Sequence, residues 1–202
     1  MLYWTRKKEP VRYRMMKPDE ILQYCLDNLE GTVMVSSWGE KGIFYNPGNL
    51  LKRGVYVLTV KEKDGDNDKS SRLNREDIYR VNIGVRKNTF IKLFGKIPGR
   101  PGKGGIVDMD YDFSAAGEIL PHPVYAWMGW ICALNPTEQL FEELKPYIQE
   151  SYEYAKEKFK KRKSQKQIFI SGSISSEVLS FCPFLGDAYA TTIHFWNEGC
   201  EG

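Results

Sequence analysis

The sequence has no long hydrophobic run and few cysteines, and each shortage excludes a class of protein. No apolar stretch approaches the roughly 20 residues that a membrane-spanning helix needs, so we expect no membrane partner. The first residues (MLYWTRKKEP) turn basic at once and do not resemble a secretory signal. The four cysteines, at positions 25, 132, 182 and 200, form no C-x-x-C pair. These features predict a cytoplasmic protein with free thiols and no disulfide framework.

Histidine is also scarce, with His122 and His194 as the two in the chain. No Ser–His–Asp or Cys–His arrangement can be identified from the sequence, so no catalytic residue is predicted. Cys182, His194 and Cys200 are too few and too widely spaced to predict a zinc site.

Acidic residues alternate in two places without forming a complete metal-binding pattern. The first group, Asp64, Asp66 and Asp68, lacks the glycine and the final glutamate of a calcium-binding loop, so we interpret it as a solvated loop. The second, at positions 108, 110 and 112, has no nearby histidine or glutamate to complete a ligand shell. The Gly/Pro loop at 99–104 lacks the spacing of a phosphate-binding loop. No metal and no cofactor are therefore predicted.

Charge is distributed unevenly along the chain, whose net charge is +3. Residues 1–17 carry +5 and residues 156–166 carry +6, which leaves −8 on the rest. Clustered positive charge is typical of nucleic-acid surfaces, so the second cluster is a candidate DNA contact. Its candidate residues are Lys156, Lys158, Lys160, Lys161, Arg162 and Lys163.

The 202 residues suffice for one hydrophobic core with small additions. Residues 1–16 lack periodicity and predict a loose basic extension. Residues 17–163 predict a single α+β domain. Residues 164–202 carry short apolar segments and predict a C-terminal appendage that docks on the domain or forms a homo-oligomer contact.

Within the domain, hydrophobic periodicity predicts the order of the elements. A helix is expected from Pro18 to Gly31, followed by an antiparallel meander over 32–38, 43–45 and 54–60. A strand at 78–85, a helix at 87–94 and a helical turn at 114–119 follow. A buried strand is expected at 127–134, where Trp130 would be a core residue whose loss costs about 3–5 kcal/mol.

A long helix closes the domain. Its predicted start has Asn135 as the cap, Pro136 in the first turn and Glu138 at the third helical position. An apolar stripe extends beyond Pro146, which should kink but not break the helix. Runs of strands with helices between them favour an α+β fold over a doubly wound parallel sheet.

Six short segments together carry a resemblance: WG at 38–39, FYNPG at 44–48, YRVNIGV at 79–85, DFS at 112–114, PHPVY at 121–125 and LNP at 134–136. Over roughly residues 18–155 the chain resembles an uncharacterised bacterial domain-of-unknown-function family, number 6194. The strand around Trp130 and the helix that follows are more distantly similar to the MmcQ/YjbR-like proteins. That second resemblance implies a compact α+β fold and a DNA-binding label.

The candidate binding site is built around His122, which two prolines hold beside Tyr125 and Trp127. In the strand at 78–85, Arg80 and Asn82 alternate with apolar residues and therefore share the opposite face. Aromatic side chains with a few polar groups are typical of ligand clefts. We therefore expect a non-catalytic module that binds an unknown small molecule near His122. The alternatives are a nucleic-acid-binding protein that uses its basic flanks, and an enzyme in which His122 is the acid or base.

Overall fold

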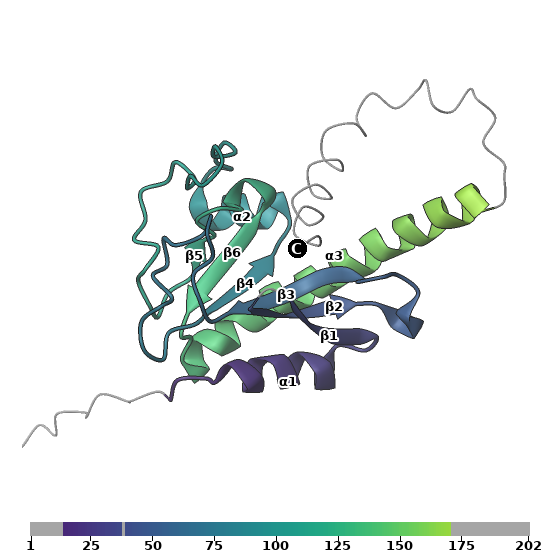
Figure 1. The fold of residues 1–202 in the computed structure, drawn as a ribbon, viewed down its shortest axis with the longest axis horizontal. Helices are drawn as coiled ribbons and strands as arrows, with labels where there is room; N and C mark the ends of the chain where they lie inside the picture. Colours follow the sequence, from purple (N-terminus) through teal and green to yellow (C-terminus); the bar gives the residue numbers. More distant parts are fainter. Residues whose placement is uncertain (1–13, 38, 171–202) are drawn as a thin grey trace, which may run out of the picture. The chain divides into compact units, whose positions relative to one another are not determined.

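The computed structural model describes residues 14–37 and 39–170 (Figure 1). The chain divides into two compact units, residues 1–159 and residues 160–202. Most of the predicted extension at 1–16 and of the predicted appendage at 164–202 lies outside the described residues. The end of the extension is attached to the domain, because Met16 N donates to Pro136 O at 2.9 Å and Glu138 N donates to Arg14 O at 2.9 Å.

The first unit contains a six-stranded antiparallel sheet, which confirms the predicted α+β class. Its spatial order is β1-β2-β3-β4-β6-β5, so each strand of the meander lies beside the next and β5 forms one edge. The strands are β1 (Thr32–Ser37), β2 (Glu40–Tyr45), β3 (Val55–Lys61), β4 (Arg80–Gly84), β5 (Leu120–Pro121) and β6 (Trp130–Leu134).

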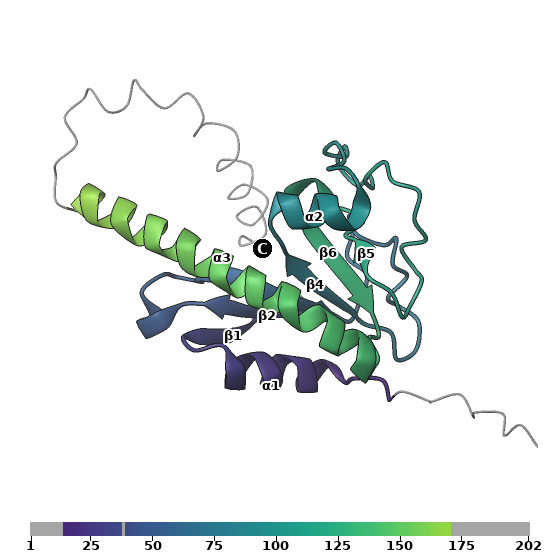
Figure 2. The same cartoon turned by 180° about the vertical axis from the view of Figure 1, so that it is seen from behind.

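In the described residues three α-helices accompany the sheet, and Figure 2 shows α1 and α3 on the same face of it. The helices are α1 (Pro18–Asn28), α2 (Lys87–Phe94) and α3 (Glu138–Ile170), with short 3-10 turns η1 (Pro47–Asn49) and η2 (Ala126–Met128). α3 continues without a break through Pro146 and supplies the described residues of the second unit, 160–170.

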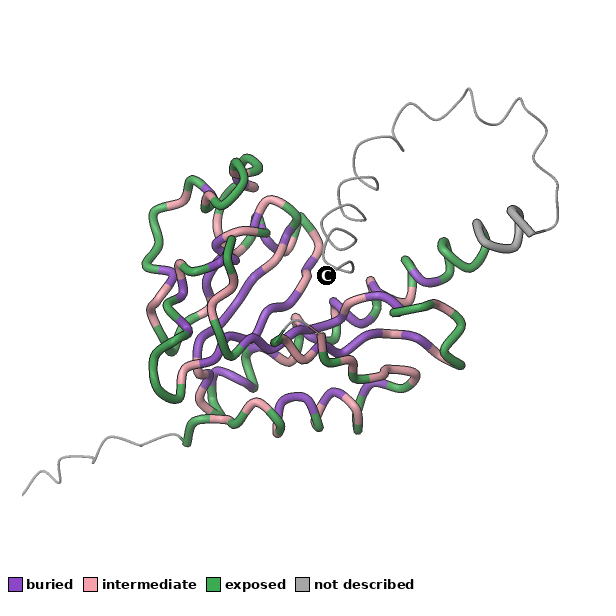
Figure 3. Tube along the Cα trace, in the orientation of Figure 1, coloured by how far each residue is buried: buried purple, intermediate pink, exposed green. Residues whose placement is uncertain are grey.

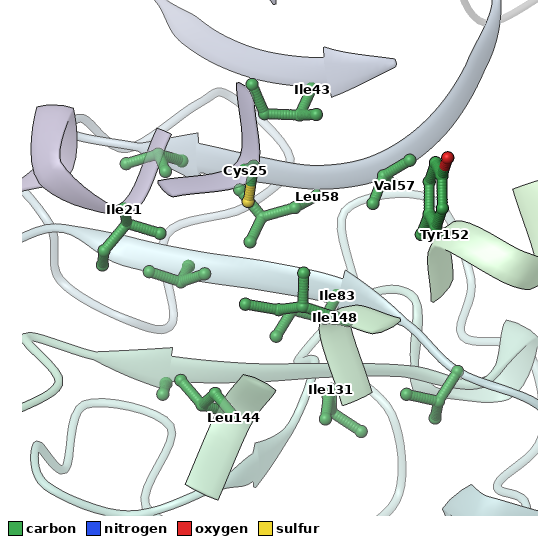
Figure 4. Close-up of a cluster of buried hydrophobic side chains, with 14 of the residues drawn as sticks. Ile21, Cys25, Ile43, Val57, Leu58, Ile83, Ile131, Leu144, Ile148 and Tyr152 are labelled. Atoms are coloured by element: carbon green, nitrogen blue, oxygen red, sulfur yellow. The ribbon is translucent and has the colours of Figure 1, made fainter. Parts of the chain in front are cut away.

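The main core lies between the sheet and the helices α1 and α3 (Figure 4). α1 begins as predicted at Pro18, and the backbone N–H of Lys17 donates to the Glu20 carboxylate at 2.7 Å. The strands are mostly buried, whereas the exposed residues gather in the loops and along the outer sides of the helices (Figure 3). The labelled core side chains are Ile21, Cys25, Ile43, Val57, Leu58, Ile83, Ile131, Leu144, Ile148 and Tyr152.

A bulge in β3 decides which of its side chains share a face. Ile43 pairs with Leu58 and the next residue of β2 pairs with Tyr56, so Val57 is an extra residue. Val57 and Leu58 both contribute to the helix-side core, while Tyr56 and Lys61 both lie on the other face. Strict alternation would have put Tyr56 and Lys61 on opposite faces. Ser151 of α3 donates to the Val57 carbonyl at 2.6 Å and fixes the bulge to the helix.

Two predicted elements differ from the structure around Trp130. The strand begins at Trp130 and not at Trp127, because η2 occupies Ala126–Met128 and Gly129 ends that turn with a φ of 84°. A residue with a side chain at position 129 would also place its Cβ 2.8 Å from the Val85 carbonyl. The helical turn predicted at 114–119 is wrong, since this segment contains only turns and bends before β5.

The start of α3 also lies later than predicted. Thr137 caps the helix, since the backbone N–H of Leu140 donates to its hydroxyl at 3.1 Å. Asn135 instead connects strands: its amide oxygen accepts from Tyr79 N at 2.8 Å and its amide nitrogen donates to Asp77 O at 2.7 Å. Across the described residues, no helix combines the length and apolar character that crossing a membrane requires.

Candidate functional site

The sheet face away from α1 and α3 carries a buried set of polar side chains. We call this set the polar network. It spans β3, β4, the loop that joins them, and the residue after β5. Loops cover one end of this face, where Leu73, Leu120, Cys132 and Leu134 form a small second apolar core. The members of the polar network are Thr59, Lys61, Asp68, Ser71, Arg80, Asn82 and His122.

Arg80 is the centre of the polar network and has 0% of its surface exposed. Its Nε donates to Asn82 Oδ1 at 2.8 Å, and Nη1 donates to Ser71 Oγ at 2.7 Å and to Asp68 Oδ1 at 3.0 Å. Nη2 donates to the second Asp68 oxygen. A buried guanidinium is tolerated only when its donors are engaged in this way.

The charged side chains of the polar network compensate one another. Lys61 connects the network to Glu40, which is partly exposed. Burial alone would raise the pKa of Asp68, but the adjacent Arg80 charge and its hydrogen bonds hold that pKa far below the usual range. Lys61 Nζ lies 3.0 Å from Asp68 Oδ2 and 3.1 Å from Glu40 Oε1. Burial lowers the pKa of Lys61, but these two carboxylates outweigh it and the pKa is raised. Both members of the Lys61–Asp68 pair therefore remain charged near neutral pH.

His122 is 2% exposed and has donors facing both of its ring nitrogens. The backbone N–H groups of Val124 and Tyr125 donate to Nδ1 at 3.1 Å each. Because Nδ1 accepts, a neutral ring carries its proton on Nε2. Arg80 Nη2 lies 3.2 Å from Nε2 but can only donate, so in this tautomer the pair is a close contact and not a hydrogen bond. Burial and then the Arg80 charge lower the pKa of His122 well below its ordinary value, although Asp68 opposes this. The imidazole is thus held neutral and acts as a cap for the turn that begins at Pro123.

Aromatic side chains lie beside the polar network on the same sheet face. We call Phe44, Tyr56, Trp130 and Tyr125 the aromatic row. Successive ring centroids are 4.3 Å apart for Phe44 and Tyr56 and 6.1 Å apart for Tyr56 and Trp130. His122 connects the row, with its ring 6.4 Å from Trp130 and 4.9 Å from Tyr125.

Glycines make room for this row. Trp130 pairs with Gly84, and the indole would lie 3.3 Å from a Cβ added to that glycine. The Phe44 ring likewise lies over Gly42, 2.6 Å from such a Cβ. The prediction that Trp130 is a fully buried core residue is therefore wrong: it is half-buried, and it lies on the face away from the helices.

Two tyrosines of the aromatic row reach the edge of the polar network. Burial, and then Glu40, raise the pKa of Tyr56 to about 12. Burial also raises the pKa of Tyr125, with Asp68 and Glu40 acting in the same direction. Tyr125 is nevertheless 40% exposed. Its hydroxyl therefore remains protonated and can donate a hydrogen bond to a ligand.

The structure brings together four of the five predicted site residues. Arg80, Asn82, His122 and Tyr125 form one contiguous group, but the first three are buried and do not themselves line an open cleft. Trp127 lies apart, half-buried against the helix-side core with the Arg100 guanidinium 5.0 Å from its ring centre.

Sequence reasoning missed Asp68, Lys61 and Tyr56 as members of this region. Asp68 was interpreted as part of a solvated loop, yet it is buried against Arg80. One signal was available: an arginine at an inward position of a buried strand requires a carboxylate partner. The face of Tyr56 depends on the bulge at Val57, which alternation does not predict.

The candidate DNA residues lie near the end of α3. Lys156 is 3.1 Å from the Glu153 carboxylate, and Lys158 lies 3.8 Å from the centre of the Tyr154 ring. Lys160, Lys161, Arg162 and Lys163 are exposed.

The remaining described residues show two other features. A shallow groove of about 440 Å³ lies between α1 and the start of α3. Its charged rim is exposed and paired internally, as in the 2.9 Å contact between Arg14 and Glu138, so the buried polar network is the stronger candidate site. No group of three metal-binding side chains occurs in the described part of the chain, and Cys25 and Cys132 there are buried free thiols.

Comparison with known protein families gives a match over most of the chain. Residues 16–164 match the family of unknown function DUF6194, a range that contains every element of the sheet and the whole polar network. No curated protein and no solved structure matches. Since the match covers most of the sequence, the chain belongs to the family of unknown function DUF6194.

Proposed function

We propose that this protein is a binding module for a small, uncharged ligand that contains a ring. The ligand would lie on the exposed parts of Tyr56, Trp130 and Tyr125, at the edge of the polar network. The observation that supports the proposal is a buried ionic network beside partly exposed aromatic rings. Such a network is costly to bury unless well paired, and it rigidifies the groups around it. Pre-organised aromatic side chains with few polar groups are typical of ligand sites.

Charge balance supports an uncharged ligand. Lys61 and Arg80 are positive, Asp68 and Glu40 are negative, and the lowered pKa of His122 keeps its ring neutral. The four formal charges cancel, and each of these groups forms an ion pair with another of the four. An ion bound here would disturb a compensated set, whereas a neutral ring can stack on the aromatic row and accept a hydrogen bond from Tyr125.

The test is a thermal-shift screen of the full chain against neutral heteroaromatic and sugar-like metabolites. A ligand that raises the melting temperature of the wild type should have no effect on Tyr125→Ala. Tyr111→Ala is a matched control, because Tyr111 is 38% exposed and packs instead on Phe94. A shift that survives in Tyr125→Ala, or that disappears equally in Tyr111→Ala, would contradict the proposed site.

A second proposal is nucleic-acid binding through the basic end of α3, favoured by the exposure of Lys160, Lys161 and Lys163. As part of this second proposal, we propose that the chain is related to the MmcQ/YjbR-like proteins and is bacterial and cytoplasmic. The order of its elements supports that relation: one helix, an antiparallel meander and a long closing helix. Filter binding at low and moderate salt tests it, and binding unaffected by Lys160→Gln/Lys161→Gln/Lys163→Gln would contradict it. A homo-oligomer contact through 164–202 stays a prediction, mostly outside the described residues.

Acid–base catalysis by His122 has less support. The ring is buried, and its Nδ1 already accepts two backbone N–H groups. A general base must reach the proton that it removes, and this geometry gives a substrate no access to Nδ1. Positioning Tyr125 is the role that its contacts support best.

A further inference from the structure

One long segment of the chain has no acidic residue. Residues 78–107 contain seven Lys/Arg and no Asp or Glu, whereas the sequence on both sides is rich in acids. The segment comprises β4, α2 and the Gly/Pro loop that follows α2. Positive charge is therefore concentrated within the domain itself, separately from the basic end of α3.

Five of these cations are exposed in the structure: Lys87, Lys92, Lys96, Arg100 and Lys103. None of the five forms an ion pair with a carboxylate of residues 14–37 or 39–164. The other two bases of the segment are paired, Arg80 with Asp68 and Arg86 with Glu157 at 2.6 Å. We call the five exposed cations the basic surface.

Contacts bring α2 and the Gly/Pro loop to the same side of the domain. Val85, just before α2, donates to the Gly129 carbonyl at 2.9 Å. Arg100 of the loop stacks over Trp127 at 5.0 Å, and Val107 at the loop's end donates to the Pro123 carbonyl at 2.8 Å. All three contacts are made with the short segment 123–129, so the start of α2 and the loop that follows it are attached to the same part of the domain.

The chemistry of this surface favours a polyanion over a lipid bilayer. A membrane-surface helix turns its apolar face outward into the bilayer. α2 instead packs Phe90, Leu93 and Phe94 on the core and exposes Lys87 and Lys92, with Ile91 as a single exposed apolar side chain. Spaced cations that have no carboxylate partner are what a phosphate backbone requires. The glycines at 99 and 102 have open space around them and allow close approach of a backbone.

We propose that the basic surface on α2 and the 95–105 loop binds the phosphate backbone of nucleic acid without regard to sequence. The proposal is independent of the small-ligand site. It also differs from binding through the end of α3, and the two are separated by charge-removing variants of the full chain.

The experiment measures fluorescence anisotropy of a labelled short DNA duplex at about 50 mM and about 200 mM salt. The test variant is Lys87→Gln/Lys92→Gln/Lys96→Gln, since glutamine keeps helix propensity and removes charge. We expect about tenfold weaker binding at low salt and a salt slope reduced by about 0.9 for each lost phosphate contact. The matched control, Lys52→Gln/Lys63→Gln/Lys69→Gln, removes the same charge from exposed positions elsewhere and should bind like the wild type.

Other results would overturn the proposal. They are absence of wild-type binding at low salt, equal loss in the control, and loss confined to Lys160→Gln/Lys161→Gln/Lys163→Gln. The last result would instead support the end of α3 as the nucleic-acid contact. Binding to phosphatidylserine vesicles without binding to DNA would assign the basic surface to a membrane and refute the nucleic-acid proposal.

Discussion

The guanidinium of Arg80 donates to both carboxylate oxygens of Asp68, which follows β3 in a loop and lies twelve positions earlier in the chain. The pair fixes the loop between β3 and β4 onto the sheet, because Ser71 of the same loop also accepts from Arg80. Bidentate pairing of this kind is stronger and more directional than a single contact. The pair therefore determines the position of this loop on the sheet face away from α1 and α3, where Lys61 also contacts Asp68.

Asp68→Asn should reduce the free energy of unfolding by about 3–5 kcal/mol, because it leaves Arg80 buried without its counter-ion. Urea denaturation followed by circular dichroism measures the change. Asp66→Asn is the control: Asp66 lies in the same loop but is exposed, and its loss should cost less than about 0.5 kcal/mol. A loss below about 1 kcal/mol for Asp68→Asn would show that the Arg80 pair does not hold the loop.

Stability should fall as the pH drops below the unfolded-state pKa of His122. The folded pKa is depressed, so the unfolded chain binds the extra proton first, and its contribution to stability is present above pH 6.5 and lost below it. The slope is at most about 1.4 kcal/mol per pH unit. His122→Asn should flatten it, because an asparagine oxygen can still accept from the backbone N–H groups of Val124 and Tyr125 and does not titrate.

The depressed pKa of Asp68 affects stability in a separate pH range, below that of His122. Its contribution is present above the unfolded carboxyl pKa of about 3.9 and is lost as the pH falls further. Urea titrations of wild type and His122→Asn between about pH 7 and pH 5 therefore isolate the histidine. Identical slopes in the two proteins would show that His122 is not held neutral by its surroundings.

Ser151→Ala should destabilise the protein by about 1–3 kcal/mol, because the buried Val57 carbonyl loses the donor that satisfies the β3 bulge. Ser164→Ala is a matched control on the same helix. Its hydroxyl is exposed and donates to the Lys160 carbonyl at 3.1 Å, so its removal should cost less than about 0.5 kcal/mol. Equal effects of the two substitutions in urea denaturation would contradict a structural role for the bulge contact.

Local periodicity predicted what local forces determine. The alternation of Tyr79, Val81, Ile83 and Val85 placed these residues in the core and Arg80 on the other face, as the structure confirms. α1 was predicted because its proline, acidic first turn and apolar spacing all agree. These signals lie within a few residues of the feature that they determine.

The site depends on contacts between distant segments, and there the sequence is less informative. Nothing near Asp68 distinguishes it from the exposed Asp66, because its burial depends on a loop folding back onto Arg80. The cap of α3 was placed at Asn135, since that residue type precedes many helices, but its side chain is engaged with Tyr79 and Asp77. The long-range pairing of β4 with β6 brings Asn135 next to Tyr79.

Trp130→Ala should cost about 1–2 kcal/mol, less than the roughly 3–5 kcal/mol of a fully buried large aromatic. The indole lies over Gly84 on the face away from the helices and makes T-shaped contacts with Tyr56 and His122. It is only half-buried, so part of its surface is already in water. Leu144→Ala provides the comparison, since Leu144 is fully buried in the helix-side core and should cost about 2–5 kcal/mol.

Urea denaturation of the two variants ranks their costs, and the thermal-shift screen gives a second readout. If Trp130 forms part of the ligand surface, Trp130→Ala should abolish the response to a ligand that still stabilises Leu144→Ala relative to its own free form. A cost for Trp130→Ala equal to or above that of Leu144→Ala would show that the indole is a structural element of the core. If Trp130→Ala keeps the ligand response, Trp130 is not part of the binding site, because binding then does not depend on the indole that lies over Gly84.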